Sequence, residues 1–248
     1  MTNGTDLCSA NINVHTAAIW TIIEVFKDQN LLSRVRAELR TIEFSAITSS
    51  QDLEKLLSLS LLQSVYAEVL RLRVEVQSVF YSEREDIKVN EWRFPKKSLL
   101  LVSAGPAHRD LNVWNTRDGE HPVDTFWADR FLVYPNDPRS GPRRKTPAEL
   151  ARFQQDQTNN ITDRGEPRYV SGGMGNSYMP YGVGERTCPG RFFAQRLMIA
   201  FCAQIVNDFD IELLTTTKDF ESSSTFYGLG AQRPLGNVPF RVRRRARC

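Results

Sequence analysis

A single cysteine lies in a tightly controlled stretch of backbone, MPYGVGERTCPGRFF, at residues 179–193. Three glycines, two prolines and two arginines accompany Cys188 in these fifteen residues. A buried structural cysteine requires nothing of its neighbours, whereas glycines at fixed offsets indicate positive φ angles or a close approach of the backbone to another group. The stretch therefore predicts a site built around the thiol of Cys188.

Two kinds of chemistry suit this thiol. Cys188 precedes Pro189 and Gly190, where a helix is expected to begin, and the positive end of a helix favours the thiolate, which is a nucleophile or a metal ligand. A cysteine protease is the weaker alternative, because no pattern places any of the three histidines nearby as a base. The four cysteines form no C-x-x-C pair, which argues against structural zinc and against a disulfide framework. One axial thiolate is sufficient for haem iron, because the porphyrin supplies the equatorial ligands.

The residues around the cysteine have roles that a haem would explain. Gly182 and Gly184 would let the backbone lie against the flat macrocycle, and Arg186 would supply a cation for a haem propionate. The run Y-G-V-G-E-R-T-C-P-G resembles the haem-binding loop of the cytochrome P450 superfamily, usually F-x-x-G-x-R-x-C-x-G. The resemblance implies that Cys188 is the axial ligand of haem b (iron protoporphyrin IX). It implies a haem-binding loop made of Tyr181, which replaces the phenylalanine, Gly182, Gly184, Arg186, Cys188 and Gly190.

The pattern E-x-x-R occurs twice, at Glu68 and Arg71 and at Glu149 and Arg152, and each copy by itself is compatible with an ordinary helical ion pair. The context separates the two copies. YAEVLRLR resembles a helix of the family, and FWADRF, with Arg130, resembles the segment that completes a Glu-Arg-Arg triad. AHRDLNVW, between these two segments, is also similar to the family. The resemblance therefore assigns the first copy and Arg130 to a buried structural network and leaves the second copy on the surface.

The sequence departs from the family pattern at the position that serves oxygen activation. Where most members carry A/G-G-x-D/E-T, this chain has S-A-N-I-N, so Ile12 replaces the acid and Asn13 replaces a threonine that helps deliver protons. Asparagine here resembles the branch that includes sterol 7α-hydroxylase and prostacyclin synthase, and it makes Asn13 the candidate catalytic residue. One of these enzymes oxidises a sterol with dioxygen, and the other isomerises a peroxide without a reductase. A second departure is Tyr81, which falls where many members carry an arginine for a haem propionate.

The expected elements are those of a mainly helical protein with small β-sheets. Apolar periodicity predicts helices over residues 10–27, 30–39, 59–72, 146–157 and 190–209. Short apolar runs predict strands at residues 76–81, 87–89 and 98–102, and a closing hairpin at residues 226–242. The first and last helices are apolar on nearly every side, which is typical of core helices, but this chain has too few other helices to cover both. Uncovered apolar surface is therefore expected on them. The resemblance implies the C-terminal half of the cytochrome P450 fold, with residues 1–248 as one partial domain.

Composition excludes several other classes of protein. A chain of 248 residues with 41% hydrophobic residues and a net charge of +3 is typical of a globular protein, and its short arginine-rich tail does not indicate nucleic-acid binding. The sequence begins without a secretory signal, and its longest apolar run, AAIWTIIEVF, is ten residues long, against roughly 20 for a bilayer span. No membrane anchor is therefore expected in these residues. For a full-length relative, the resemblance implies the endoplasmic reticulum membrane.

The resemblance implies a haem-thiolate monooxygenase that oxidises a lipophilic small molecule, such as a sterol, a terpenoid or another secondary metabolite. Dioxygen and NADPH-cytochrome P450 reductase would be its partners, and electron donation by the thiolate favours cleavage of the O–O bond. Two alternatives stay open. An isomerase or dehydratase would use the same haem without a reductase, so dependence on NADPH separates it from a monooxygenase. A truncated, non-catalytic P450 would bind haem weakly or not at all.

Overall fold

The computed structural model describes residues 4–157, 165–215 and 220–246, without the side chains of residues 4–11, 153–157, 186 and 226. The helices are α1 (Gly4–Lys27), α2 (Gln29–Thr41), α3 (Ser50–Leu57), α4 (Ser60–Arg73), α5 (Ala104–His108), α6 (Pro147–Gln157) and α7 (Arg191–Asp208). The strands are β1 (Val74–Tyr81), β2 (Ile87–Val89), β3 (Trp92–Phe94), β4 (Leu99–Ser103), β5 (Leu132–Val133), β6 (Arg168–Tyr169), β7 (Phe209–Leu213), β8 (Leu229–Ala231) and β9 (Phe240–Arg244). These elements confirm the expected mainly helical architecture with small sheets.

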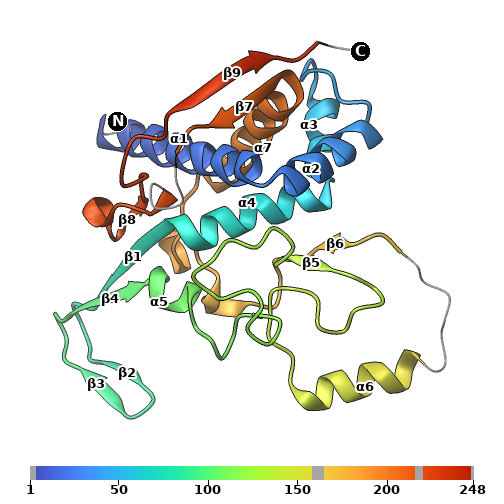
Figure 1. The fold of residues 1–248 in the computed structure, drawn as a ribbon. Helices are drawn as coiled ribbons and strands as arrows, with labels where there is room; N and C mark the ends of the chain where they lie inside the picture. The colour runs from blue at the N-terminus through green and yellow to red at the C-terminus, as the bar shows by residue number, and fades with distance from the viewer. Residues whose placement is uncertain (1–3, 158–164, 216–219, 247–248) are drawn as a thin grey trace.

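Helix α4 lies at the centre of the molecule. In Figure 1 it runs between the group formed by α1, α2, α3 and α7 and the irregular segments that surround α5 and β5. Every residue from Leu61 to Leu72 is buried. The helix begins without a side-chain cap of its own. The carboxylate of Glu38 on α2 takes this role, because it accepts hydrogen bonds from the N–H groups of Leu61 (2.7 Å) and Leu62 (2.9 Å) at the positive end of the helix.

Helices α1 and α7 pack against each other and against α4, but one face of each is open. The core side of α7 buries Met198 and Cys202. The other side exposes Phe193, Leu197 and Phe201, with exposed fractions of 67%, 38% and 43%. These three residues follow one another at intervals of four, so they form a single apolar stripe along the helix. Together with Ile12 and Ile19 of α1, which are also exposed, this stripe confirms the expectation that the chain leaves apolar surface of these two helices uncovered.

Strand β1 is the centre of the largest sheet, whose order is β4-β1-β8 with antiparallel pairing throughout. Strand β9 pairs with β7 instead of with β8, so the expected closing hairpin at residues 226–242 is wrong. The pairing that the structure has brings opposite charges together. Arg243 and Arg241 of β9 lie opposite Asp210 and Glu212 of β7, with N···O distances of 3.1 and 3.4 Å. The basic tail therefore serves the sheet of its own chain.

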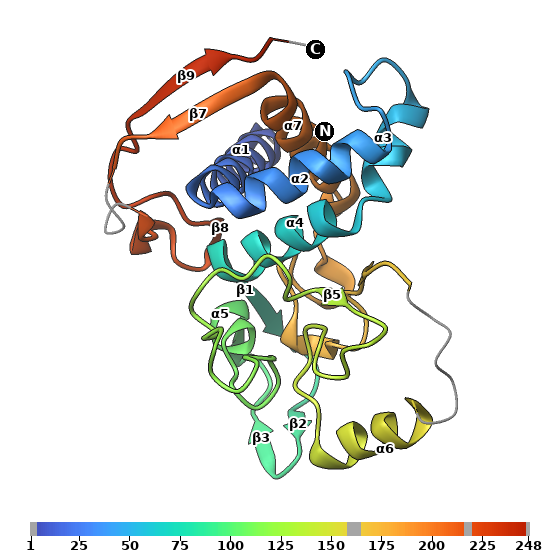
Figure 2. The ribbon, with the colours of Figure 1, turned by 45° about the vertical axis from the view of Figure 1, so that its right-hand side comes forward.

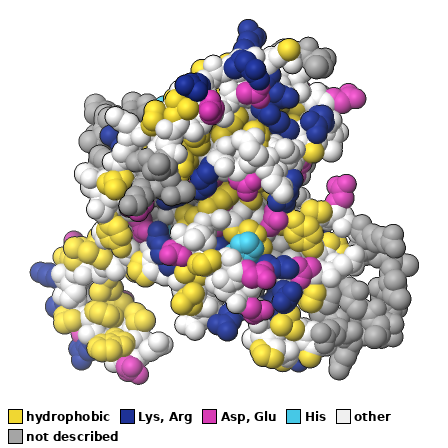
Figure 3. All heavy atoms as spheres, in the orientation of Figure 1, with side chains coloured by type: hydrophobic (Ala, Val, Ile, Leu, Met, Phe, Trp, Pro, Cys, Tyr) yellow, Lys and Arg dark blue, Asp and Glu magenta, His cyan; other side chains and the backbone are white. Residues whose placement is uncertain are grey.

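Sequence periodicity missed several short elements, among them α3 and β3. Helix α3 has eight residues and begins with a capping box, in which Ser49 and Asp52 exchange side-chain and backbone hydrogen bonds. Strand β3 has three residues and forms, with β2, a hairpin that projects from the body (Figures 1 and 2). Figure 3 shows hydrophobic side chains on this hairpin, and Val89 and Trp92 are among its exposed residues. In the described ranges, no helix combines the length and hydropathy that crossing a bilayer requires.

Candidate active site

Cys188 carries a free, exposed thiol at the entry to α7. Its N–H donates to the carbonyl of Tyr181 over 2.9 Å. Its carbonyl accepts from the backbone N–H of Arg191 (3.4 Å) and from Nη1 of the same residue (3.1 Å). Helix α7 begins at Arg191, and Gly190 is its N-cap. Pro189 therefore precedes the helix, whereas the sequence had suggested that it occupies the first turn. The backbone is thus fixed on both sides of the sulfur.

The glycines of the cysteine loop have two different structural reasons. Gly182 and Gly184 have φ angles of +76° and +69°, which confirms the expected need for residues without a Cβ. Both residues face β1, where a Cβ at Gly182 would lie 3.3 Å from Oγ of Ser78. Gly190 has an ordinary φ of −79°. A Cβ on Gly190 would lie 3.8 Å from Sγ of Cys188, so this glycine leaves space beside the sulfur.

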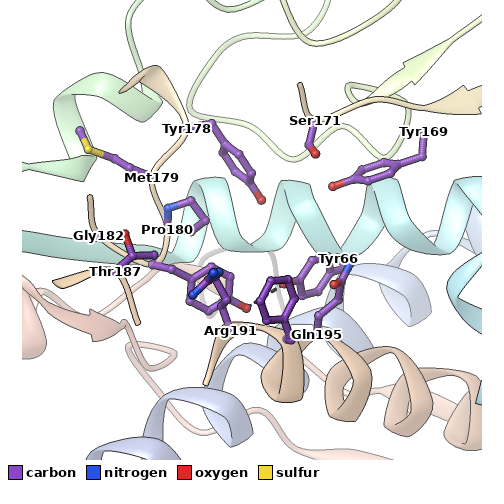
Figure 4. A pocket seen from close by; sticks show the side chains of 12 residues that line it. Tyr66, Tyr169, Ser171, Tyr178, Met179, Pro180, Gly182, Thr187, Arg191 and Gln195 are labelled. Carbon is purple, nitrogen blue, oxygen red and sulfur yellow. Dashed lines mark hydrogen bonds between the residues drawn. The ribbon is translucent and has the colours of Figure 1, made fainter. Parts of the chain in front are cut away.

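Tyr181 connects the loop to α4. Its hydroxyl forms a hydrogen bond of 2.7 Å with the hydroxyl of Tyr66, and burial raises the pKa of Tyr181 to about 12, so the phenol stays protonated. The two rings line a cavity of about 280 Å³ next to the loop, with Tyr178 and Tyr169 on one side and Arg191 and Gln195 on the other (Figure 4). The remaining lining residues are Ser171, Met179, Pro180, Gly182, Thr187 and Phe192.

The first E-x-x-R copy forms the predicted buried network. Nε and Nη2 of Arg71 donate to Glu68 over 2.7 and 2.8 Å, and Nε of Arg130 donates to the same carboxylate over 2.9 Å. All three side chains have exposed fractions of 0%. Burial alone would raise the pKa of Glu68, but the charges of the two arginines outweigh it and lower that pKa. In the second copy, Glu149 pairs with Arg143 and accepts from the N–H of Thr146 at the start of α6, which is the expected surface role.

Asn13 contacts the strand that pairs with β1. Its Oδ1 accepts a hydrogen bond of 3.0 Å from the N–H of Ala231, and a Cβ on the neighbouring Gly230 would collide with the Asn13 amide. Ala231 lies opposite Val74, while Gly182 lies close to Val76 of the same strand. Strand β1 therefore supports both Asn13 and the cysteine loop. The Nδ2 group of Asn13 can donate hydrogen bonds to a further partner.

The two predicted propionate positions have different outcomes. Arg186 lies in the 3-10 turn η2 (Gly184–Arg186), but its side chain is outside the described residues, so its role stays a prediction. Tyr81 is the last residue of β1, opposite Leu99, and its ring is exposed.

One buried residue of the region escaped sequence reasoning. His108 hydrogen-bonds both the end of α4, at the carbonyl of Arg71, and the chain entering the cysteine loop, at the N–H of Met179. The only sequence signal for this role was the position of His108 in AHRDLNVW. The hydrogen bonds themselves join His108 to residues that are 37 and 71 positions away in the chain.

The residues at Cys188 fit a metal group that brings most of its own ligands. Within the described ranges, no group of three or more His, Cys, Asp and Glu side chains converges on one point. A metal bound at the Cys188 sulfur would therefore take its other ligands from elsewhere, as haem iron does from a porphyrin. The exposed sulfur and the open space at Gly190 suit such a flat group. Cys202 does not, because it is buried in α7, where burial raises the pKa of its thiol to about 12.

Comparisons with known proteins agree with this geometry. The family model for Cytochrome P450 matches residues 13–132 and 151–240. The chain is 36% identical over 246 residues to cytochrome P450 monooxygenase efuG of Hormonema carpetanum, covering 96% of this chain and 42% of that protein. It is 37% identical over 246 residues to cytochrome P450 monooxygenase fsoE of Humicola fuscoatra, covering 96% and 40%. The chain thus spans about two fifths of the length of these curated relatives.

Solved structures share the fold of this chain. A solved structure of a cyanobacterial P450 with bound retinoic acid superposes with a TM-score of 0.64 at 22% identity, covering 95% of this chain and 43% of that one. The buried Glu68 network, the cysteine loop with its positive-φ glycines and the match of the family model over both segments lead to one assignment. The chain belongs to the cytochrome P450 family, whose cofactor is haem.

Proposed function

We propose that residues 1–248 supply the haem-binding part of one cytochrome P450 domain in a monooxygenase that oxidises a lipophilic small molecule, such as a sterol, a terpenoid or another secondary metabolite. The observation that carries the proposal is the exposed thiol of Cys188, held at the entry to α7 by a loop with two positive-φ glycines. The names of the two fungal relatives, both monooxygenases, support the reaction type. Exposed apolar residues near Asn13, namely Ile12 and Leu229, support a lipophilic substrate.

Each residue of the loop has a definite task in this proposal. Cys188 would provide the thiolate ligand to haem b, and Arg186 would pair with a propionate. Gly190 would leave space beside the sulfur, while Gly182 and Gly184 supply the positive φ angles that the loop requires. Tyr181 fixes the loop to α4 through Tyr66. The bound haem supplies the activation of dioxygen, with electrons from NADPH-cytochrome P450 reductase. Asn13 would donate a hydrogen bond from Nδ2 to an oxygen-bearing ligand.

The ligand assignment is tested by the spectrum of the reduced, carbon-monoxide-bound holoprotein. Cys188→Ser should abolish the red-shifted carbonyl band of a thiolate-bound haem, whereas Cys202→Ser should keep it. Cys202 is the matched control, because it is the free cysteine that α7 buries. A Cys188 variant that retained the band would overturn the assignment.

The reaction type is tested in the complete protein, since the chain covers about two fifths of its relatives. We expect product formation to require NADPH, the reductase and dioxygen, and Asn13→Thr to change the fraction of oxygen released as peroxide. Conversion of a hydroperoxide to an isomer without a reductase would instead identify an isomerase. By resemblance, we propose the endoplasmic reticulum membrane as the location of the complete protein.

A further inference from the structure

His108 lies between the Glu68 network and the cysteine loop, which are the two parts of the site. It is the last residue of α5, and its side chain is fully buried. Nδ1 is 3.0 Å from the carbonyl oxygen of Arg71, and Nε2 accepts the N–H of Met179 over 3.0 Å. Because Nε2 is an acceptor, Nδ1 carries the proton and donates to the Arg71 carbonyl. The ring therefore bridges the Arg71 carbonyl and the Met179 N–H, and these two partners together determine its tautomer.

The Met179 end of this bridge leads directly to the cysteine. The carbonyl of Met179 accepts a hydrogen bond of 3.1 Å from the N–H of Gly182. This bond forms the turn with which the cysteine loop begins. The next residue with a loop contact, Tyr181, accepts the N–H of Cys188 over 2.9 Å. His108 therefore connects to Cys188 through a short series of backbone hydrogen bonds. A displacement of Met179 would pass to the sulfur through this turn.

The other end of the bridge is anchored in the buried network of α4. Nη1 of Arg71 donates to the carbonyl of His108 over 2.7 Å, so Arg71 and His108 are bonded in both directions. The ring of His108 packs near Tyr178, with centroids 5.8 Å apart, and the Tyr178 hydroxyl donates to the carbonyl of Ala67 on α4 over 3.1 Å. Burial, followed by the charge of Arg71, lowers the pKa of His108 to about 3, so the ring is neutral.

We propose that His108 is a positioning residue for Cys188: its neutral ring transmits the fixed geometry of α4 to Met179 and so holds the cysteine loop where the thiolate can ligate haem iron. The inference rests on the proposed function of Cys188. His108 contacts no ligand in this arrangement and acts through Met179 alone.

Two variants separate the acceptor from the rest of the ring. In His108→Gln, Oε1 reaches the place of Nε2 and accepts the N–H of Met179. In His108→Asn, the shorter amide reaches the place of Nδ1 and can donate to the Arg71 carbonyl, but it leaves Met179 unpaired. Both substitutions are polar and smaller than histidine, but Asn is one methylene smaller than Gln. The local exchange of the Met179 amide is therefore measured beside the spectrum, because it separates the lost acceptor from a general loss of packing.

The first readout is the carbonyl band of the reduced holoprotein. For His108→Asn we expect a large fraction of the haem, at least half, to move to the band of a haem without a thiolate ligand. For His108→Gln we expect the wild-type band to dominate. Equal spectra for the two variants would overturn the proposal.

The second readout does not depend on the haem spectrum. Hydrogen exchange of the Met179 amide should accelerate at least tenfold in His108→Asn relative to His108→Gln, while the amides of α1 exchange at the same rate in both. If Cys188→Ser kept the carbonyl band, the ligand assignment would fail while the exchange result on Met179 stood. If both variants failed to fold, the nitrogen chemical shifts of His108 in the wild-type protein decide, because a proton on Nε2 contradicts the bridge.

Discussion

Helices α4 and α7 contribute to the same site but differ in how completely neighbouring residues cover their side chains. From Leu61 to Leu72, α4 is buried on every side, and its charged groups are paired within the described chain. Helix α7 has an equally apolar sequence, yet it leaves Phe193, Leu197 and Phe201 exposed on one side. Hydrophobicity alone thus does not decide burial. The neighbours that a helix meets decide it, and for the outer stripe of α7 the described residues supply none.

The largest effect on stability is expected when the buried ion-pair network of α4 is disrupted. Glu68→Gln removes the carboxylate that Arg71 and Arg130 share, and it leaves two buried guanidinium groups without their counter-charge. We expect a loss of about 3 to 5 kcal/mol in the free energy of unfolding, measured by urea denaturation of the holoprotein. Glu149→Gln, in the second E-x-x-R copy on the surface, is the matched control and should leave the urea midpoint unchanged. Equal effects of the two variants would show that the network is not a centre of stability.

Leucine truncations compare the two helices directly. Leu62→Ala, at a position that is 0% exposed on α4, should cost about 2 to 5 kcal/mol because it leaves a cavity. Leu197→Ala, on the outer stripe of α7, should cost less than about 1 kcal/mol in residues 1–248 by themselves. Calorimetry of both variants measures the difference. A loss as large at Leu197 as at Leu62 would mean that another surface covers the stripe, for instance in a self-associated form.

The buried histidine predicts a pH dependence of stability at the α4 side of the site. The folded pKa of His108, about 3, lies below its ordinary value of 6.5, because of burial and the charges of Arg71 and Arg109, which Glu68 only partly offsets. The unfolded chain therefore binds the proton first, and the contribution of His108 is complete above pH 6.5 and is lost as the pH falls. Between pH 7.5 and pH 5 we expect wild type to lose about 2 kcal/mol that His108→Gln does not lose. Parallel urea midpoints for the two proteins over this range would contradict the assignment of a neutral ring.

The smallest effect is expected at the β7–β9 pair, whose charged side chains are exposed, whereas those of the α4 network are buried. Arg243→Gln removes one exposed partner of Asp210, which keeps Arg36 at 2.8 Å. The expected change in the free energy of unfolding is below about 0.5 kcal/mol and decreases further with added salt. Thermal melts at low and high ionic strength measure it. A loss of several kcal/mol would show that the surface pairs, and not the core, hold the C-terminal strand.

The sequence by itself determined those features that consecutive residues encode. Gly182 and Gly184 predicted positive φ angles, because only glycine adopts them without strain, and the structure has +76° and +69° there. The spacing of Glu68 and Arg71 placed both groups on one face of a helix, and the resemblance of FWADRF to the family assigned Arg130 as their partner. Helical periodicity identified the regions of α1, α2, α4, α6 and α7 to within a few residues at most ends. It started α1 too late, at residue 10 instead of Gly4.

Only the tertiary structure decided which surfaces and polar atoms meet. The bond from Ala231 to Asn13 joins residues 218 positions apart, and the bond from Met179 to His108 spans 71 positions. The pairing of β8 with β1 and of β9 with β7 likewise depends on what each strand finds beside it. Local propensity carries no information on such encounters, because a helix or strand forms with the same backbone whichever neighbour covers it. Burial and hydrogen bonding between distant segments are set by packing, and packing exists only in the folded chain.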